Sequence, residues 1–577
     1  METLNQPLKD SYNEFPYKSQ GFAHTQPGRL QALARMKGLT PPALENARVL
    51  EIGCSYGGNI IPFALRYPNA KVVGVDLSEH QIDVGKQILK ELEIDNIELI
   101  QGDICQVSFD TEFDYIICHG VFSWVPENVQ EGILQAVSKY LSPNGVAFIS
   151  YNTYPGWKIK EIAKDLMIFG SKASAAPAER VSQSFNMLKF VNNYLNGRHH
   201  QLAKPLSHLF NHIMEQAPYY ITHEYFETYN KPMYFLDFVE KVEEFGLSYL
   251  TDSRSPIVPH YLYFKNDEWE QLCQGCEGKV EFVEQFVDFL LNKEFRNSVI
   301  TRRENLVANN VSNHIEVYNK CFNFEEIHFM VYPIEYVEAT DDEMAHWAVE
   351  SDKIQISANK HSNLLFNYLK EREYQTVNVG DVLRDLKNHP DFDEGDATNL
   401  LFMLIHNAST YIGLHPISRS QSVTDKPFML TKIRKLIEII QQNPNLLSLS
   451  DIYTRIIEFD YFAYYLSQHL DGTNNLQDLM AIINKAVEDK KIQFYEDGQP
   501  IGRDVIDDKR VEEYINNCLK NFHYLGFLCE KNTADLTASV EVKEGERSDA
   551  VTENTAKATA SQQSKAKKAK AKKAKGK

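Results

Sequence analysis

The chain has 577 residues, of which 43% are hydrophobic and 24% charged, so three or four folded domains are expected rather than one. Its formal net charge of −19 argues against broad, phosphate-driven nucleic-acid binding by the folded part, although a local basic groove is compatible with it. No apolar run reaches the roughly 18–20 residues of a membrane helix, and the polar N-terminus lacks the order of a signal peptide. We therefore expect a cytoplasmic protein.

Residues 48–154 alternate short apolar strands with amphipathic helices. The expected strands are Arg48–Ile52, Lys71–Asp76, Ile97–Gln101, Phe113–Cys118 and Val146–Tyr151. Helical patterns lie between most of them, which predicts a parallel sheet covered by helices on both faces. The first domain is thus expected to be α/β and doubly wound, over residues 1–190, with an N-terminal extension.

Beyond Trp157 the pattern becomes mostly helical, for example from Asn363 to Leu386. Short helices followed by apolar hairpin-like pieces predict winged-helix-like accessory domains. Residues 531–577 are rich in Thr, Ala, Ser and Glu and end in Lys-Ala repeats, so a disordered, Lys-rich tail is expected. Its nine lysines after Glu553 could attract an acidic partner, such as an anionic membrane surface or nucleic acid. They could also be presented to the active site of the same or another copy of the chain, or could simply aid solubility.

The strongest chemical signal is the turn after the first strand, where Gly53 and Gly57 precede a helix. Small residues let the backbone approach a ligand, and a helix N-terminus offers free N–H groups. Asp76 ends the next strand, where a carboxylate suits the two hydroxyls of a ribose. Asp103 follows the third strand, where an acid can accept a hydrogen bond from an adenine amino group. Together they predict a site for an adenosine-like ligand at the carboxyl edge of the sheet.

The segment Glu51-Ile-Gly53-Cys-Ser55-Tyr-Gly57, with Asp76 and Asp103, resembles motifs I to III of the class I S-adenosylmethionine-dependent methyltransferases. The acid before the first glycine, Glu51, distinguishes it from a dinucleotide-binding loop. Ser55 stands where the family often has glycine, a minor departure because serine is also small. The resemblance implies a Rossmann-like domain, S-adenosyl-L-methionine as cofactor, and cofactor contacts from Glu51, Gly53, Ser55, Gly57, Asp76 and Asp103.

Longer segments resemble bacterial methyltransferases that carry a methyltransferase regulatory domain, whose studied members include outer-membrane-protein lysine methyltransferases. These segments are Tyr17–Leu30, His119–Pro126, Tyr151–Trp157, His223–Asn230, Met233–Phe238 and Phe245–Leu250. Together with the helical patterns, the resemblance implies a methyltransferase domain at 1–190, a regulatory domain at 191–320, a middle α+β or winged-helix-like domain at 321–425 and a C-terminal winged-helix-like domain at 426–530.

Methyl transfer is an in-line displacement, so an enzyme must chiefly align donor and acceptor and exclude water. Aromatic residues that follow the fourth and fifth strands predict a partly dry channel, which would lower the pKa of an acceptor lysine and guide its ammonium by cation–π contact. These aromatic residues are Phe122, Trp124, Tyr151, Tyr154 and Trp157. The catalytic candidates are His119, Tyr151, Tyr154 and Trp157.

Each candidate also has a purely structural interpretation. Asp76 could cap the following helix, His119 could be a packed core histidine, and Trp157 could be a domain-interface aromatic. No metal site is expected, because Cys273 and Cys276 have no second ligand pair at zinc-finger spacing.

Three functions are compatible with these patterns. The first is a protein-lysine methyltransferase whose accessory domains, residues 191–530, hold a protein substrate. The second is a methyltransferase acting on a small molecule or nucleic acid, which the lack of an Asn-Pro-Pro-Tyr or Asp-Pro-Pro-Tyr motif after the fourth strand disfavours for amino groups of bases. The third is a non-catalytic S-adenosylmethionine-binding protein. The sequence leaves the identity of the acceptor and the oligomeric state open.

Overall fold

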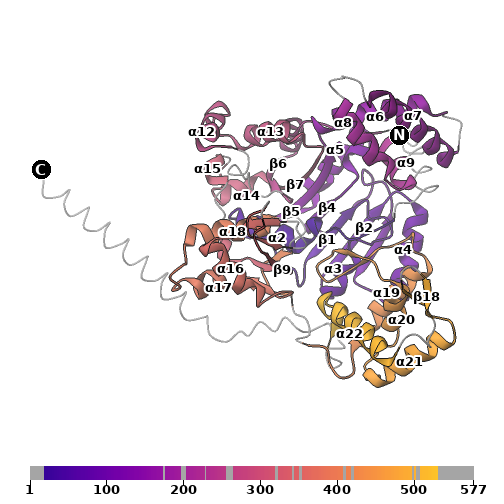
Figure 1. Cartoon of the computed structure of the whole chain (residues 1–577). Coiled ribbons are helices and arrows are strands. Elements are labelled where there is room, and N and C mark those ends of the chain that lie inside the picture. Colours follow the sequence, from indigo (N-terminus) through magenta and orange to yellow (C-terminus); the bar gives the residue numbers. More distant parts are fainter. Residues whose placement is uncertain are drawn as a thin grey trace, which may run out of the picture. The chain divides into compact units, whose positions relative to one another are not determined.

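A computed structural model describes most of the chain (Figure 1). The described residues are 18–529 apart from 173–175, 197–202, 228, 255–263, 313, 319–321, 341–342, 350–353, 407–410, 418–421, 497–498 and 502–506. The expected tail at 531–577 lies outside them.

A seven-stranded sheet lies at the centre of the described residues, in the strand order β3-β2-β1-β4-β5-β7-β6. Its strands are β1 (Arg48–Ile52), β2 (Lys71–Asp76), β3 (Ile97–Gln101), β4 (Phe113–Cys118), β5 (Leu141–Asn152), β6 (Leu247–Asp252) and β7 (Phe295–Arg302). The first five pair in parallel, whereas β7 runs antiparallel to both β5 and β6. The Rossmann-like α/β class is confirmed, with a mixed rather than an all-parallel sheet.

The sheet extends beyond the boundary expected at residue 190. Strand β7 pairs with β5 over seven residues, from Asn152 opposite Phe295 to Val146 opposite Thr301. Without it, the backbone N–H and C=O groups on that side of β5 would lie at an open edge. Residues 247–302 therefore complete the same sheet that residues 48–152 begin.

Alternate residues of each strand face two separate hydrophobic cores, as the pleat requires. Val49 and Phe148 point into one core, and Leu50 and Ile149 into the other. The covering helices are α2 (Pro27–Met36), α3 (Ile61–Arg66) and α4 (Glu79–Glu91) on the first face and α5 (Glu127–Tyr140) and α10 (Phe235–Glu244) on the second. Helix α4 begins where the Ser78 hydroxyl accepts the N–H of Gln81.

Between β5 and β6 in the sequence, the chain forms a group of helices that pack around their own core, which includes Met167, Leu188 and Phe210. Its helices are α6 (Gly156–Gly170), α7 (Pro177–Leu195), α8 (Ala203–Met214) and α9 (Pro218–Phe226). Between β6 and β7 lie α12 (Asn266–Gly275) and α13 (Val280–Leu291), and after β7 come α14 (Arg303–Ala308) and α15 (Ile315–Tyr318).

The next segment mixes short strands with helices. Its elements are η3 (Phe324–Glu326), β8 (His328–Met330), β9 (Ile334–Val337), β10 (His346–Val349), β11 (Ile354–Ser357), α16 (Lys360–Lys370), β12 (Thr376–Asn378), α17 (Val379–Leu386), α18 (Glu394–His406) and β13 (Ile412–Gly413). The continuous helix expected from Asn363 to Leu386 is wrong. Strand β12 interrupts it, because its backbone pairs with β8, a contact that the local pattern does not reveal.

The C-terminal segment combines helices with two-stranded sheets, in agreement with the expected winged-helix-like domain. Its elements are β14 (Phe428–Met429), α19 (Thr431–Gln442), β15 (Leu449–Ser450), β16 (Ile456–Ile457), α20 (Tyr461–Ser467), α21 (Leu476–Glu488), β17 (Phe494–Glu496), β18 (Gln499–Ile501), α22 (Asp508–Tyr524) and β19 (Leu528–Cys529). No helix in the described part of the chain has the length and apolar content needed to cross a membrane.

Candidate active site

The turn after β1 brings backbone N–H groups to the carboxyl edge of the sheet. Gly53 has a φ of +79° and Gly57 a φ of +88°, a region that glycine adopts without strain. The Gly53 N–H donates to the Val75 carbonyl at 2.8 Å. A Cβ at Gly53 would lie 2.3 Å from Cγ2 of Val121. The loop thus depends on the two glycines for its path.

Asp76, at the end of β2, fastens this loop. Its Oδ2 accepts the Ser55 N–H and its Oδ1 accepts the Ser78 N–H, both at 2.9 Å. Burial raises the pKa of Asp76, although these N–H groups act in the opposite direction. The bond to Ser78, just before α4, agrees in part with the structural interpretation of Asp76 as a helix cap. Each carboxylate oxygen still has a further lone pair that could accept a hydrogen bond from a ribose hydroxyl.

Glu51 is only 3% exposed and lies beneath the loop. Its Oε1 accepts a hydrogen bond from the Asn59 amide at 2.7 Å, and its Oε2 is buried without a partner. Burial raises the pKa of Glu51 to about 8, against the effect of the Asn59 bond and with a smaller contribution from the charge of Asp76. The hydroxyl of Ser55 is likewise buried without a partner. Both orphaned oxygens belong to the predicted cofactor motif.

His119 follows β4 and packs beneath the N-terminal segment. Its Nδ1 lies 3.0 Å from the Ser150 hydroxyl, and its ring centroid lies 4.1 Å from that of Phe22. Burial, aided by the charge of Arg254, lowers the pKa of His119 to about 3, so the imidazole is neutral at pH 7. A Cβ at the following Gly120 would meet no atom within 4 Å. His119 is therefore a packed histidine that borders open space at the edge of the sheet.

Asp103 lies near Asp76, because the N–H of Gly102 donates to the Asp76 carbonyl at 2.9 Å. The side chain of Asp103 is half-buried, and its Oδ1 accepts the Cys105 N–H at 2.9 Å. Asp103 thus lies in the turn after β3 (Ile97–Gln101), the strand next to β2, where an adenine contact was expected.

Tyr151 lies apart from the other candidates. It points to the sheet face opposite Ser150, where its ring stacks on Phe238 at 4.1 Å and its hydroxyl lies 3.3 Å from that of Ser298. The side chain is 1% exposed. Tyr151 thus belongs to the second hydrophobic core, on the face of β5 opposite the Ser150 contact with His119, and its catalytic role stays a prediction.

Tyr154 and Trp157 lie after β5, and each already faces a lysine of α6. The Nζ of Lys158 lies 3.7 Å from the Tyr154 ring centroid, and that of Lys160 lies 5.1 Å from the Trp157 ring. The Tyr154 hydroxyl donates to Glu161 at 2.6 Å, whereas Trp157 is 1% exposed. Tyr154 is the more accessible of the two aromatics, and both rings accept cations.

The N-terminal segment contributes residues to which no role was assigned from the sequence. The N–H of Phe22 donates to the Asn59 carbonyl oxygen Oδ1 at 2.9 Å. His24, in the short helix η1 (Ala23–Thr25), lies 5.1 Å from the His119 ring, and its Nε2 is buried without a partner. Burial lowers the pKa of His24, followed by the effects of His119, Arg254 and Arg29. The polar residues just before α2 were the sequence signal that could have indicated these contacts of the N-terminal segment with the candidate site.

Comparisons with known proteins agree with this geometry. A methyltransferase-domain family matches residues 49–145, a predicted methyltransferase regulatory domain matches 217–302, and the C-terminal winged helix domain of PKMT matches 439–527. Uncharacterized protein RP028 of Rickettsia prowazekii is 40% identical over 237 residues, which cover 41% of this chain and 95% of that protein. Uncharacterized protein RP789 of the same organism is 29% identical over 527 residues, 89% of this chain and 92% of that one.

A solved structure covers most of the chain as well. PKMT2 from Rickettsia typhi in complex with AdoHcy has a TM-score of 0.75 and 26% identity, over 89% of this chain and all of that one. This chain belongs to the class I S-adenosylmethionine-dependent methyltransferases with a methyltransferase regulatory domain. The resemblance carried by residues 51–57, Asp76 and Asp103 is thereby confirmed at the level of the family.

The residues of this methyltransferase fit S-adenosylmethionine. Two orphaned oxygens, on Glu51 and Ser55, and the glycine loop lie at the edge where the methionine part would need polar contacts. Asp76 would hold the ribose and Asp103 the adenine. Within the described residues, no group of three or more histidines, cysteines or acids could hold a metal ion.

Proposed function

We propose that this methyltransferase transfers methyl groups to lysine side chains of a protein substrate. The observation that carries the proposal is the similarity to PKMT2 over the accessory domains as well as the methyltransferase domain. Domains of this size beyond the cofactor site favour a large acceptor over a small molecule. The divisions at residues 320, 425 and 530, and the attraction of the Lys-rich tail to an acidic partner, remain parts of the same proposal. The division at residue 190 marks the start of the regulatory segment and not the end of the sheet, because β6 and β7 belong to the same sheet as β1–β5.

The chain itself would contribute alignment and a suitable electrostatic environment. S-adenosylmethionine supplies the electrophilic methyl group on a sulfonium. Neutral His119 and His24 add no positive charge near the carboxyl end of β4, so they would not repel a sulfonium there. The carboxyl of Glu51 would favour a cationic ligand once ionised. The loop held by Asp76 fixes the donor in one orientation, which is the main requirement of an in-line displacement.

A lysine acceptor must lose its proton before it can attack, because its ordinary pKa is about 10.4. Aromatic walls lower that pKa by excluding water and still attract the ammonium through their ring faces. Tyr154 is suited to this role, since its ring already accepts Lys158. A substrate lysine could replace Lys158 there without a new charge being buried.

Methyl transfer from radiolabelled S-adenosylmethionine into a fractionated cell lysate tests the proposal. Label on lysine in the protein fraction is expected. Label confined to nucleic acid or small molecules would favour the second function, and the absence of label in every fraction would favour a non-catalytic binding protein. Asp76→Ala serves as the control for transfer that depends on the donor site.

We also propose a cytoplasmic location. The cysteines in the described residues are free thiols, and two of them are buried, Cys54 in the turn after β1 and Cys118 at the end of β4. Such usage is typical of proteins in a reducing compartment. Fractionation of cells that express the full chain checks this location.

A further inference from the structure

Helix α13 exposes apolar side chains to solvent and buries several polar ones. Its exposed residues are all apolar: Phe282 (46%), Phe286 (42%), Phe289 (52%), Leu290 (52%) and Leu291 (45%). Its buried residues include three polar ones, Glu284 (4%), Gln285 (6%) and Asp288 (0%). We call the five exposed residues the α13 face. A surface helix ordinarily shows the reverse arrangement.

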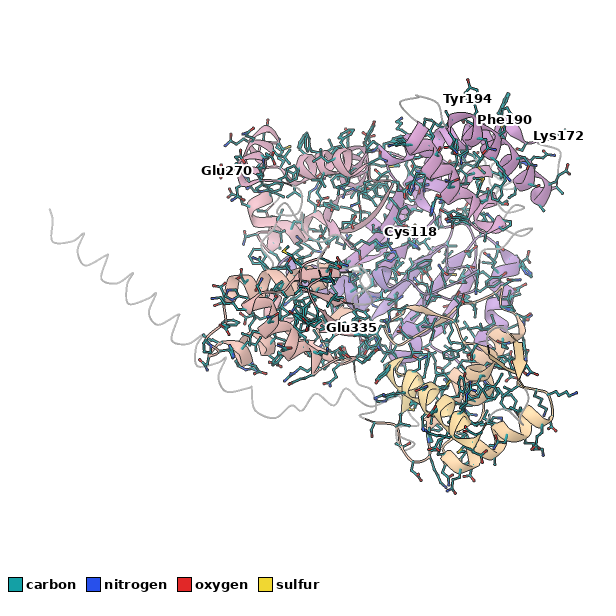
Figure 2. The ribbon with its side chains drawn as sticks, viewed as in Figure 1. Cys118, Lys172, Phe190, Tyr194, Glu270 and Glu335 are labelled. Carbon is teal, nitrogen blue, oxygen red and sulfur yellow. The ribbon has the colours of Figure 1, made fainter. Side chains whose placement is uncertain are left out.

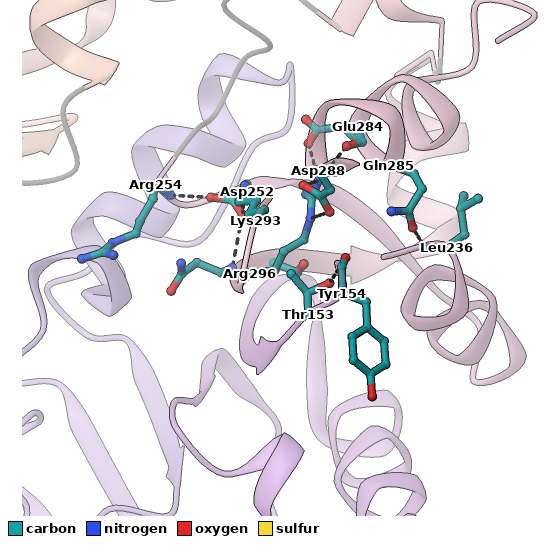
Figure 3. A network of polar contacts seen from close by, with 12 residues as sticks. Thr153, Tyr154, Leu236, Asp252, Arg254, Glu284, Gln285, Asp288, Lys293 and Arg296 are labelled. Carbon is teal, nitrogen blue, oxygen red and sulfur yellow. Dashed lines mark hydrogen bonds and ion pairs between the residues drawn. The ribbon is translucent and has the colours of Figure 1, made fainter. Parts of the chain in front are cut away.

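Arg296 on β7 explains this orientation (Figure 3). Its Nε and Nη2 donate to the two oxygens of Asp288 at 2.8 and 2.7 Å, and Nη2 also donates to Glu284 at 2.8 Å. The Gln285 side chain accepts the N–H of Leu236 at 3.1 Å. Because positions 284 and 288 share one side of a helix, these bonds fix its rotation. The phenylalanines at positions 282, 286 and 289, spaced by four and three residues, must then point outward together.

An exposed apolar face of this kind is unusual on a soluble surface and marks an interaction site. The buried polar cluster shows that the orientation is maintained by specific bonds. Polar residues at the outer positions would leave the bonds to Arg296 unchanged. The apolar residues of the α13 face are therefore not needed to hold the helix in this orientation.

The α13 face continues towards the candidate active site. The ring of Phe289 lies 5.6 Å from Tyr234, and Tyr234 lies 5.3 Å from Tyr154. The end of α13 also packs closely on the start of α6, where a Cβ at Gly156 would lie 2.6 Å from the Asn292 carbonyl oxygen. Aromatic rings thus connect the face with the carboxyl end of β5.

The α13 face carries little net charge. Of the three acids in residues 280–291, Glu284 and Asp288 are buried and paired with Arg296. Lys279, just before the helix, lies 5.4 Å from the Phe282 ring, and Glu294, just after it, pairs with Lys160 at 3.0 Å. Lys279 over Phe282 and Lys158 over Tyr154 show that aromatic rings at both ends of this surface accept ammonium groups.

We propose that the α13 face, together with Tyr234 and Tyr154, binds apolar side chains of an extended segment of the protein substrate, close to the lysine that accepts the methyl group. The inference rests on the proposed function. It adds a substrate class: lysines flanked by aromatic and aliphatic residues, accessible in a chain that is not yet folded.

Two fluorescent 15-residue peptides with one central lysine test this proposal. One carries Phe or Leu at alternate positions, and the other carries Ser or Gln there. Binding to the full chain saturated with AdoHcy is measured by fluorescence anisotropy. The double variant Phe286→Ser/Phe289→Ser should bind the apolar peptide at least about tenfold more weakly than wild type. Phe190→Ser on α7, a matched control at a 70% exposed position labelled in Figure 2, should bind as wild type does.

Thermal unfolding and AdoHcy affinity verify that each variant is folded, and Phe282→Ser on the preceding turn provides a second test. Unchanged binding of the apolar peptide by both variants would overturn the proposal. So would a change of sedimentation mass in the double variant, since the face would then join two copies of the chain. Failure of the proposed function has a different signature, in which wild type binds the apolar peptide but labels no protein lysine.

Discussion

Two buried polar regions of the molecule are constructed in opposite ways. Around Arg296, the carboxylates of Glu284 and Asp288 accept hydrogen bonds from Nε and Nη2 of the guanidinium, whereas Nη1 is buried without a partner. At the cofactor loop, one oxygen of Glu51 and the hydroxyl of Ser55 are buried without a partner. An unsatisfied buried polar group costs about 1–3 kcal/mol. The first region is neutralised by ion pairs within the chain and determines the orientation of α13, whereas the second has two unpartnered oxygens in the motif predicted to bind the cofactor.

Removal of the guanidinium should give the largest effect on stability. Arg296→Met leaves two buried carboxylates without their partner, which should lower the free energy of unfolding by about 3–5 kcal/mol. Urea denaturation measures this loss. The exposed pair Arg384–Asp381 provides the control, because Arg384→Met should change the same quantity by less than about 1 kcal/mol. Equal losses in the two variants would contradict the structural role of the buried cluster.

The next largest effect concerns the affinity of the cofactor loop for AdoHcy. Asp76→Ala removes both the predicted ribose acceptor and the anchor of the Ser55 N–H, so the affinity for AdoHcy should fall about 100-fold. Isothermal titration calorimetry measures it. Asp103→Ala, which removes one adenine contact, should cost about tenfold. If Asp76→Ala bound AdoHcy as tightly as wild type, the assignment of the ribose would be wrong.

A smaller effect should appear in the pH dependence of stability without ligand. Burial raises the pKa of Glu51 from 4.5 to about 8, so the folded state binds more protons than the unfolded state between these values. Stability therefore falls as the pH rises through this range. Lowered histidine pKa values, to about 3 for His119, act in the opposite sense but only below 6.5. Between pH 6.5 and 8 the wild type should lose about 1–2 kcal/mol of unfolding free energy.

Glu51→Gln separates this effect from other titrating groups. The amide cannot ionise, so its unfolding free energy, measured in urea at pH 6.5 and pH 8, should stay nearly constant. A wild-type slope that persists in Glu51→Gln would assign the pH dependence elsewhere.

The sequence predicted the first five strands and the positions of the cofactor motif, because alternating apolar runs and the glycine turn are local signals. It did not place β6 and β7 in the same sheet, since the pairing of β7 with β5 joins residues about 150 positions apart and β6 joins the sheet only through β7. The position of the Arg296 cluster depends on the same long-range pairing. Sequence analysis accordingly predicted the cofactor site but not the α13 face.

Tyr151 shows a second limit of local signals. Strand alternation was available from the sequence, but it does not tell which face of β5 lies against His119. The Ser150 hydroxyl makes that contact, so Tyr151 lies on the opposite face and packs on Phe238. Proximity to the end of a strand therefore does not by itself decide which side chains can meet a ligand.

The smallest effect on AdoHcy affinity should come from the hydrogen bond between Ser19 and Gly58 at the cofactor loop. The Ser19 hydroxyl accepts the N–H of Gly58 at 2.9 Å, while the backbone of Ser19 bonds to Leu446 and Ser448 in the C-terminal segment. Ser19→Ala leaves one loop N–H without its acceptor, so AdoHcy affinity should fall about fivefold, close to the 1 kcal/mol typical of one hydrogen bond. The control Ser171→Ala, at a position outside the loop, should bind AdoHcy as wild type does. A wild-type affinity in Ser19→Ala, measured by calorimetry, would mean that the Ser19 hydroxyl does not help to hold the loop in its donor-binding conformation.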